Sequence, residues 1–229
     1  MYYSQGKYSE AIKYNQNCLE IQEKLKGKGS IDTASTLNNI GNVYKDQGNY
    51  SEAIKYYQRC LEIQEKYKGK GNIDTALTLK NVGIVYKSQG NYNEAIKYYQ
   101  RCLEIQEKAK GKGNIDTAPT LNNLGNVYTE QGNYNEAIKY YQRCLEIKEK
   151  VKGKGSIDTA LTLNNIGMVY KGQGNYSEAI NYYQHCLEIQ EKVKGKGNID
   201  TASTLKNIGI VYKSQGNYSE AIKYYQRCL

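Results

Sequence analysis

Apolar side chains recur along the chain with the i, i+3, i+4, i+7 spacing that places them on one face of an α-helix. The segment 49–68 follows this spacing, with apolar residues at Tyr50, Ala53, Ile54, Tyr57, Cys60 and Leu61. A second helix is predicted for 75–88, with one face formed by Leu79, Val82, Gly83 and Tyr86. The short turn Gln89-Gly90-Asn91 leads into the next helix, so the two helices should lie antiparallel. We call segments equivalent to 75–88 A helices and segments equivalent to 49–68 B helices.

Capping chemistry predicts where these helices begin and end. Asn49 can cap the B helix, and Glu52 three residues later completes a capping-box pattern. Gly69 and Gly71 should end the B helix, because glycine accepts the left-handed conformation at a helix C-terminus. Asp74 is the expected N-cap of the A helix.

The two-helix unit recurs with a period of 42 residues, marked by Tyr8, Tyr50, Tyr92, Tyr134, Tyr176 and Tyr218. A fixed period in this range indicates stacked units in which each repeat contacts only its neighbours. We therefore predict an all-α solenoid, a single array over 1–229. Its expected divisions are a partial repeat at 1–28, repeats at about 29–70, 71–112, 113–154 and 155–196, and a truncated repeat at 197–229. Gly83, in an A-helix interior where glycine costs about 1 kcal/mol, should allow another helix to approach closely.

The repeated residues resemble the tetratricopeptide repeat (TPR). Its pattern of large, Leu-type, Gly, Tyr, Ala, aromatic and small positions falls on Leu37, Ile40, Gly41, Tyr44, Tyr50, Ala53, Tyr57 and Cys60. Leu replaces the usual Trp, Tyr replaces Phe, Cys replaces Ala, and the late Pro is missing. The repeat is also similar to the 42-residue TPRs of kinesin light chains. This resemblance implies a right-handed superhelix of antiparallel hairpins whose A helices line a concave, peptide-binding face.

Composition adds two points to this picture. All 25 aromatic residues are tyrosine, so tyrosine rings must fill the core while their hydroxyls reach water or a partner. Much of the net charge of +9 recurs near the ends of the B helices, at Lys24, Lys26, Lys28, Lys66, Lys68, Lys70, Lys108, Lys110 and Lys112. Lysines there complement the negative end of the helix dipole, and an acidic partner or nucleic acid is the alternative explanation.

The six cysteines occupy one equivalent position, at Cys18, Cys60, Cys102, Cys144, Cys186 and Cys228. Helices of neighbouring repeats lie about 10 Å apart, beyond the roughly 7 Å that a disulfide spans. We expect buried, free thiols at Cys60, Cys102 and Cys144, as in a reducing compartment such as the cytoplasm. The sequence shows no secretory leader and no apolar run of membrane-spanning length.

A candidate binding surface lies on the A helices, opposite their apolar face, where the repeats differ most. In successive repeats, the position of Ser35 holds Leu77, Pro119, Leu161 and Ser203. The position of Asn38 holds Lys80, Asn122, Asn164 and Lys206, and the position of Asn42 holds Ile84, Asn126, Met168 and Ile210. Variation confined to one face suggests that this face meets a non-repetitive partner, and neutral drift at exposed sites is the alternative. The same face carries lysines that favour acidic peptides, Lys45, Lys87, Lys171 and Lys213.

One polar position on this surface does not vary, and it holds Asn39, Asn81, Asn123, Asn165 and Asn207. A side-chain amide offers both a donor and an acceptor, so a ladder of them can pair with the backbone of an extended peptide. The kinesin-light-chain resemblance implies such a role for these positions. Alternatively, each Asn bonds the neighbouring helix and sets the geometry of the repeat. The two interpretations are compatible.

Other known chemistries do not fit the sequence. The carboxylate clamp of TPR chaperone adaptors has a Lys and an Asn one helical turn apart. Here Lys80 is followed by Ile84 and Lys206 by Ile210, so the Asn of the clamp is missing. His185, the only histidine, stands where other repeats have Arg, which indicates an exposed substitution. There is no zinc-ligand spacing, phosphate-binding loop or catalytic triad. We therefore predict a protein that is not an enzyme and uses no cofactor.

These patterns favour a protein-interaction scaffold that binds an extended segment of a partner. Binding of nucleic acid or an acidic surface through the Lys-Gly-Lys-Gly segments is less favoured, and a spacer without a ligand is a further alternative. Tyrosine pairs such as Tyr56 and Tyr57 could stack on bases, but their helical spacing favours core packing.

The two ends of the chain should expose surfaces that interior repeats bury. The first B helix has no complete A helix before it, so Tyr8, Ile12 and Leu19 should be partly uncovered. The last B helix has no A helix after it, which should uncover Tyr225 and Leu229. Such end surfaces predict head-to-tail self-association.

Overall fold

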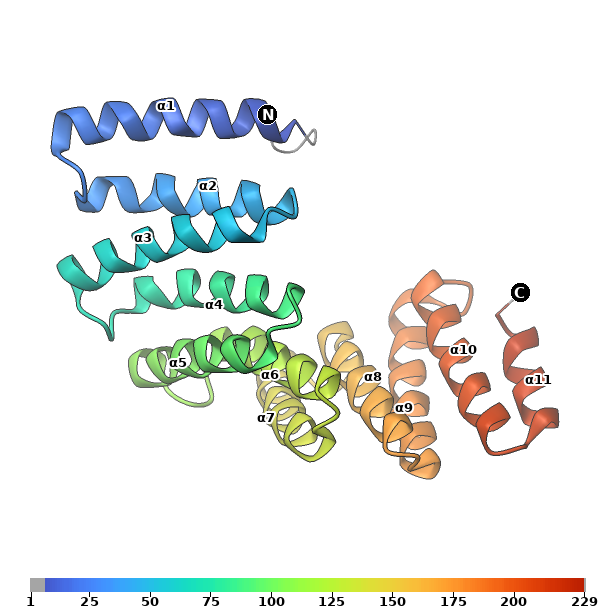
Figure 1. Cartoon of the computed structure of the whole chain (residues 1–229). Coiled ribbons are helices and arrows are strands. Elements are labelled where there is room, and N and C mark those ends of the chain that lie inside the picture. Colours follow the sequence, from blue (N-terminus) through green and yellow to red (C-terminus); the bar gives the residue numbers. More distant parts are fainter. Residues whose placement is uncertain (1–6, 229) are drawn as a thin grey trace. The chain divides into compact units, whose positions relative to one another are not determined.

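The computed structural model describes residues 7–228, which form eleven α-helices and two 3₁₀ turns, with no strand among them (Figure 1). The predicted all-α architecture is therefore confirmed. Contacts divide the chain into two units, Met1–Lys112 and Gly113–Leu229. The division coincides with a predicted repeat boundary, and each unit is described by itself.

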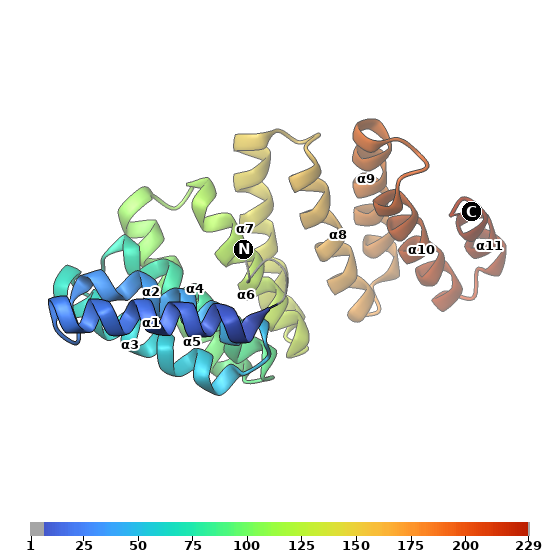
Figure 2. The same cartoon turned by 90° about the horizontal axis from the view of Figure 1, so that it is seen from above.

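The first unit contains the helices α1 (Tyr8–Lys26), α2 (Ala34–Asp46), α3 (Tyr50–Lys68), α4 (Ile73–Ser88) and α5 (Tyr92–Lys110), and the 3₁₀ turn η1 (Ile31–Thr33). Helices α2 and α3 form one antiparallel hairpin, and α4 and α5 form the next (Figures 1 and 2). The A helices are α2 and α4, and the B helices are α1, α3 and α5.

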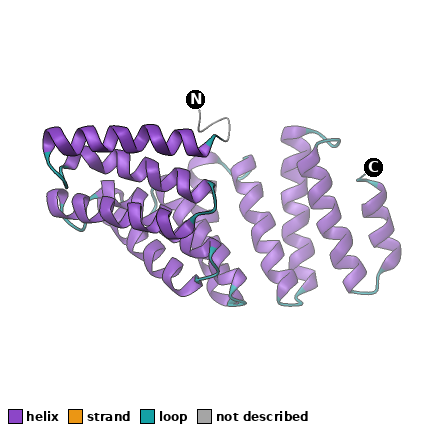
Figure 3. Ribbon diagram, turned by 45° about the horizontal axis from the view of Figure 1, so that its top comes forward, coloured by secondary structure: helices purple, strands orange, loops and turns teal. Residues whose placement is uncertain are grey.

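The second unit repeats this arrangement with three hairpins (Figure 3). Its elements are η2 (Ile115–Thr117), α6 (Ala118–Glu130), α7 (Tyr134–Lys152), α8 (Ile157–Gly172), α9 (Tyr176–Lys194), α10 (Ile199–Ser214) and α11 (Tyr218–Gln226). The A helices are α6, α8 and α10, and each precedes its B helix.

The N-cap prediction for the A helices was wrong by two residues. Asn72 caps α4, because its side-chain oxygen accepts a hydrogen bond of 2.9 Å from the backbone N–H of Asp74. Its backbone is extended, at φ −75° and ψ 139°, as an N-cap requires. Asp74 instead lies in the first turn, where its charge complements the helix dipole.

The B-helix predictions are confirmed only in part. Asn49 does cap α3, accepting from the N–H of Glu52 at 3.4 Å, but its own N–H donates to the carbonyl of Tyr44 rather than to Glu52. Gly69 ends α3 at φ 85° and ψ 153°. This is not the left-handed helical region, yet it is also accessible essentially only to glycine. Gly71 has no positive φ, so it is not part of the stop signal.

Each hairpin is held together by a tyrosine ring packed on a glycine. A Cβ atom placed on Gly83 would lie 2.6 Å from Cε1 of Tyr99, which is buried at 1% exposure. The same contact joins Gly41 with Tyr57. The expected close approach at Gly83 is therefore confirmed, and the approaching group is an aromatic ring.

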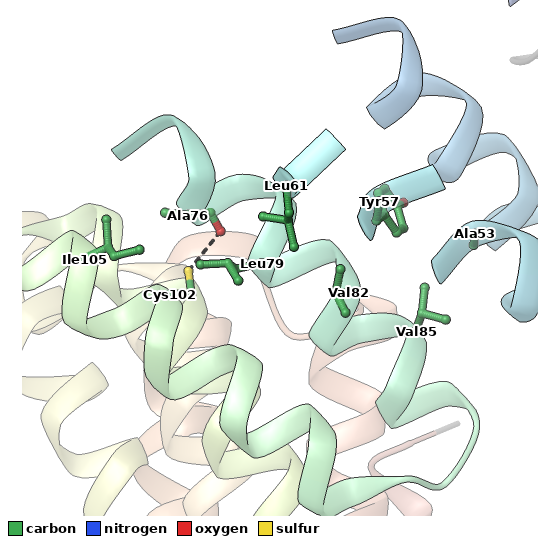
Figure 4. Packing of buried hydrophobic residues seen from close by; sticks show 9 residues of the cluster. All are labelled: Ala53, Tyr57, Leu61, Ala76, Leu79, Val82, Val85, Cys102 and Ile105. Atoms are coloured by element: carbon green, nitrogen blue, oxygen red, sulfur yellow. Dashed lines mark hydrogen bonds between the residues drawn. The ribbon is translucent and has the colours of Figure 1, made fainter. Parts of the chain in front are cut away.

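Within each unit, an A helix also packs against the B helix of the repeat before it, as α4 does against α3 and α8 against α7. Leu79, Val82 and Val85 of α4 belong to one buried cluster with Tyr57 of α3 and Cys102 of α5 (Figure 4). Within the hairpin of α2 and α3, the ring of Tyr44 stacks on the ring of Tyr56, with ring centroids 5.5 Å apart. Tyrosine therefore fills the core and the hairpin contact, as predicted, and Tyr56 is a packing residue.

The expectation of buried, unpaired thiols is confirmed for Cys60, Cys102 and Cys144, and Cys186 is also free and buried. The Cys102 thiol donates to the carbonyl of Ala76 at 3.1 Å (Figure 4). These groups fix the register between successive helices without covalent bonds.

The end expectations hold for some residues only. Leu19 is buried at 6% exposure among Leu37, Ile40 and Ile63, so its predicted exposure was wrong. The side of α1 that lacks a neighbour carries Tyr14, Ile21 and Leu25 instead. Tyr8, Ile12 and Tyr225 are half-buried, and Leu229 lies outside the described residues.

The glycine contact predicts that Gly83→Ala destabilises the protein. The added methyl group would displace the Tyr99 ring, at a cost of roughly 1–3 kcal/mol that exceeds the helix-propensity gain of up to about 1 kcal/mol. Urea unfolding should therefore show a net loss of about 1–2 kcal/mol. Gly71→Ala is the matched control, since no atom lies within 4 Å of its added Cβ. Equal stability of the two variants would contradict the packing argument.

Alkaline pH should destabilise the protein through its buried thiols. Burial raises the pKa of Cys186 from its ordinary 9.0 to about 11, because the thiolate is poorly solvated. The unfolded chain therefore loses this proton first, and the contribution present below pH 9 disappears as pH rises through 11. Urea unfolding across this range should show a steady loss. In Cys186→Ala the decline should be shallower, and an identical slope would refute the assignment.

Candidate functional site

The predicted binding surface is largely accessible in the structure. Asn39, Lys206, Lys213 and Met168 are exposed, while the half-buried positions are Asn38, Asn42, Lys45, Lys80, Ile84, Lys87, Asn122, Asn123, Asn126, Asn164, Asn165, Lys171, Asn207 and Ile210. Asn81 is the exception, at 8% exposure. The surface is therefore defined by the A helices as expected, but its members are not equally available to a ligand.

Three asparagines of the ladder bond to the A helix of the preceding repeat. Asn81 Nδ2 lies 3.3 Å from the side-chain oxygens of both Asn38 and Asn42. The corresponding bonds are Asn165 to Asn122 at 3.0 Å and Asn207 to Asn164 at 3.2 Å. These three residues therefore make the bond to the neighbouring A helix that the alternative interpretation expects.

Asn39 and Asn123 differ from the other three. Between residues 7 and 228, neither side chain has a hydrogen-bonding partner within the protein. Within its own unit, each of these amides therefore has donor and acceptor capacity that no described residue uses.

The variable position at Asn42 is coupled to the core. The hydroxyl of Tyr57 donates to the side-chain oxygen of Asn42 at 2.6 Å, and Tyr141 donates to Asn126 at 2.5 Å. At Met168 no such acceptor exists, and the buried hydroxyl of Tyr183 has no partner among the described protein atoms. Variation here therefore changes internal hydrogen bonding as well as the surface.

Two hollows of the same construction lie on this surface, one in each unit. The hollow of unit 1 has a volume of about 380 Å³ and is lined by Asn38, Asn39, Gln64, Lys68, Asp74 and Leu77, among others. The hollow of unit 2 has a volume of about 500 Å³ and is lined by Asn122, Asn123, Lys148, Lys152, Asp158 and Leu161, among others. Every residue of the second set stands 84 positions after its counterpart. We call them hollow 1 and hollow 2.

Each hollow combines an amide with an apolar wall and a charged end. Leu77 and Leu161 are half-exposed, at 53% and 50%, and contribute apolar surface. In hollow 1 the charged end is neutralised, because Lys68 Nζ lies 2.5 Å from Asp74 Oδ2. Sequence reasoning missed the B-helix residues of both hollows. The signal for one of them was Lys148, which stands where four other repeats have glutamine.

The lysines predicted to attract acidic peptides are partly engaged within the protein. Lys45 Nζ lies 3.2 Å from Asp46 Oδ1, and burial lowers the pKa of Lys45. The lysines near the B-helix ends also pair with carboxylates, as in Lys108 with Glu104 at 2.7 Å. Part of the basic edge is thus neutralised locally, which supports the helix-dipole explanation for those residues.

The remaining candidate features are the histidine, possible metal sites and possible membrane-spanning helices. His185 is exposed, as predicted. Across residues 7–228, no three His, Cys, Asp or Glu side chains come together as a metal site. None of the helices in that range combines the length and apolar character needed to cross a membrane.

A family model of the tetratricopeptide repeat matches residues 1–66, 32–108, 74–150 and 158–229. The chain belongs to the tetratricopeptide repeat family. TPR repeats generally mediate protein–protein interaction, and the family is generally non-enzymatic. No curated protein matches the sequence.

Solved structures share the fold of this TPR chain. BtubC (BKLC) from P. vanneervenii is 20% identical, with a TM-score of 0.80, and the match covers 96% of this chain and 89% of that one. A putative kinesin light chain of Podosopora anserina with nearly identical TPR-like repeats is 16% identical, with a TM-score of 0.75 and coverage of 85% and 92%. The expected likeness to kinesin light chain repeats is thereby confirmed for the fold.

The unpartnered hydroxyl of Tyr183 predicts a stabilising substitution. Met168→Asn should supply the acceptor that Asn126 supplies to Tyr141, and should raise the free energy of unfolding by about 1 kcal/mol. Asn126→Met is the reciprocal variant, and should lower it by about 1–2 kcal/mol because it leaves a buried donor unpaired. Thermal and urea unfolding measure both. A destabilised Met168→Asn protein would show that the tyrosine–asparagine bond adds nothing to stability.

Proposed function

We propose that this TPR protein is an interaction scaffold that binds an extended segment of a partner protein along the exposed face of its A helices. The observation that carries the proposal is the recurrence of the same hollow in both units, each containing a ladder asparagine without an internal hydrogen bond. A site with an unsatisfied amide beside half-exposed leucine has both polar and apolar interactions to offer.

The chemistry of the hollows suits a polypeptide backbone. Asn39 and Asn123 can each donate to a peptide carbonyl and accept from a peptide N–H, whatever the sequence of the ligand. Leu77 and Leu161 can cover one apolar side chain of the ligand in each unit. The positions that vary between repeats would then select among partners.

Partner segments with acidic residues fit this proposal better than nucleic acid does. The exposed lysines on the A-helix face are Lys206 and Lys213, while several lysines of the basic edge pair with carboxylates. Free thiols at the repeat contacts suit a protein that works in a reducing compartment such as the cytoplasm.

Replacing Asn39 and Asn123 together by alanine should weaken partner binding roughly thirtyfold, because two ligand hydrogen bonds of about 1 kcal/mol each disappear. Partners captured from a peptide array would be measured in solution with the wild-type and variant proteins. Thermal stability should be unchanged, because neither amide is bonded within the protein.

Asn81→Ala is the matched control for this experiment. It should lower stability, since Asn81 connects α4 to α2, while the amide of Asn39 stays available to the ligand. If the double variant binds as tightly as wild type, the asparagines do not hold the ligand. If an array of unrelated extended peptides shows no binding at all, the proposed function itself fails.

A further inference from the structure

Hollow 2 contains a positive charge that hollow 1 lacks. Lys148 is half-buried on α7, and its Nζ donates to the hydroxyl of Thr162 at 2.9 Å and to the carbonyl of Asp158 at 3.2 Å. Both acceptors are neutral. Over residues 7–228, no carboxylate forms an ion pair with Lys148. Lys148 also hydrogen-bonds the thiol of Cys144 beside it, so the contacts of its ammonium group with the protein are to neutral groups and its positive charge stays uncompensated.

Hollow 1 shows that this lysine is not needed to build the repeat. Its counterpart Gln64 contacts the same two groups, since its Oε1 accepts from the hydroxyl of Thr78 at 3.0 Å and its Nε2 donates to the carbonyl of Asp74 at 3.4 Å. Glutamine therefore makes both structural contacts without carrying a charge. The substitution at 148 leaves the fold intact and changes the chemistry of the hollow.

The charge balance of the two hollows differs accordingly. Hollow 1 is lined by one lysine and one aspartate, and these are paired. Hollow 2 is lined by Lys148, Lys152 and Asp158, and no ion pair joins Lys152 to Asp158. Hollow 2 thus has one net positive charge, beside the amide of Asn123 and an apolar wall formed by Pro119 and Leu161.

We propose that hollow 2 binds the side-chain carboxylate of an Asp or Glu within an extended partner segment, next to an apolar residue that packs on Leu161. This inference rests on the proposed function, and it assigns a chemical class to one of its two hollows. The charge of Lys148 and the amide of Asn123 provide the attraction for the carboxylate. The apolar wall reduces the local dielectric, which strengthens the attraction between the charges.

A singly charged carboxylate fits this site better than a phosphate. A phosphorylated residue carries a charge of about −1.5 to −2 and three strong acceptor oxygens. Hollow 2 has one net positive charge, and the carboxylate of Asp158 lines it. The second negative charge of a phosphate would lack a partner and face that carboxylate.

An array of extended peptides tests the inference. Each peptide is acetylated and C-terminally amidated, and carries Leu followed by Glu, Gln or phosphoserine at its centre, with no other acidic residue. Wild type should bind the Glu member roughly fivefold more tightly than the Gln member, as for a charge-assisted hydrogen bond at a partly exposed site. High salt should reduce that ratio.

Two substitutions exchange the character of the hollows. Lys148→Gln should remove the preference for Glu while leaving the binding of the Gln peptide and the thermal stability unchanged, because Gln64 occupies the same surroundings in unit 1. Gln64→Lys should give hollow 1 the same preference, seen as a larger ratio between the affinities for the Glu and the Gln peptide.

The outcomes separate this inference from the proposed function. Binding with equal affinity for Glu and Gln, or a preference that survives Lys148→Gln, would overturn the carboxylate site and leave the scaffold function standing. Tighter binding of the phosphoserine member would also overturn it, in favour of a phosphate site. Absence of binding by every peptide would overturn both proposals.

Discussion

The contact between a tyrosine ring and a helix glycine determines how close the two helices of each hairpin come. At Gly41 the ring of Tyr57 occupies the space that any Cβ atom would need. The ring also has a polar end, and its hydroxyl reaches Asn42 on the A helix at 2.6 Å. Asn42 in turn accepts from Asn81 of the next repeat. A core contact, a hairpin and the connection between repeats therefore form one chain of interactions.

This connection limits what the binding surface can do. An asparagine that bonds the preceding A helix, as Asn81 does, has less capacity left for a ligand, and its replacement also disturbs the repeat contact. Met168 illustrates the opposite change, because a different surface residue leaves the hydroxyl of Tyr183 without an acceptor. Burying an unpaired hydroxyl costs about 1–3 kcal/mol. Surface variation in this protein consequently affects stability, and only some positions are free of that coupling.

Much of the fold follows from the sequence because the local signals repeat. The 42-residue period, the helical spacing of apolar residues and the glycine at position 83 predict the hairpins and their close approach. Cap positions were missed where two signals compete, since both Asn72 and Asp74 favour an N-cap and the choice depends on the backbone. The division of the asparagine ladder was also missed. Whether an amide is engaged depends on the residue one repeat earlier, as with Asn38 before Asn81, and an interpretation of single helices does not compare such pairs.

The near-identity of the repeats explains how one hollow can acquire a new chemistry without loss of the fold. In a solenoid, stability is roughly a sum over repeats and their neighbour contacts. A substitution is therefore tolerated when it preserves the contacts of its own repeat. Lys148 meets this condition, because it keeps the two hydrogen bonds that Gln64 makes in the equivalent place. What changes is the charge on the wall of the hollow. A repeat array can in this way diversify its ligand contacts one position at a time, at sites where the new side chain keeps the hydrogen bonds of the old one.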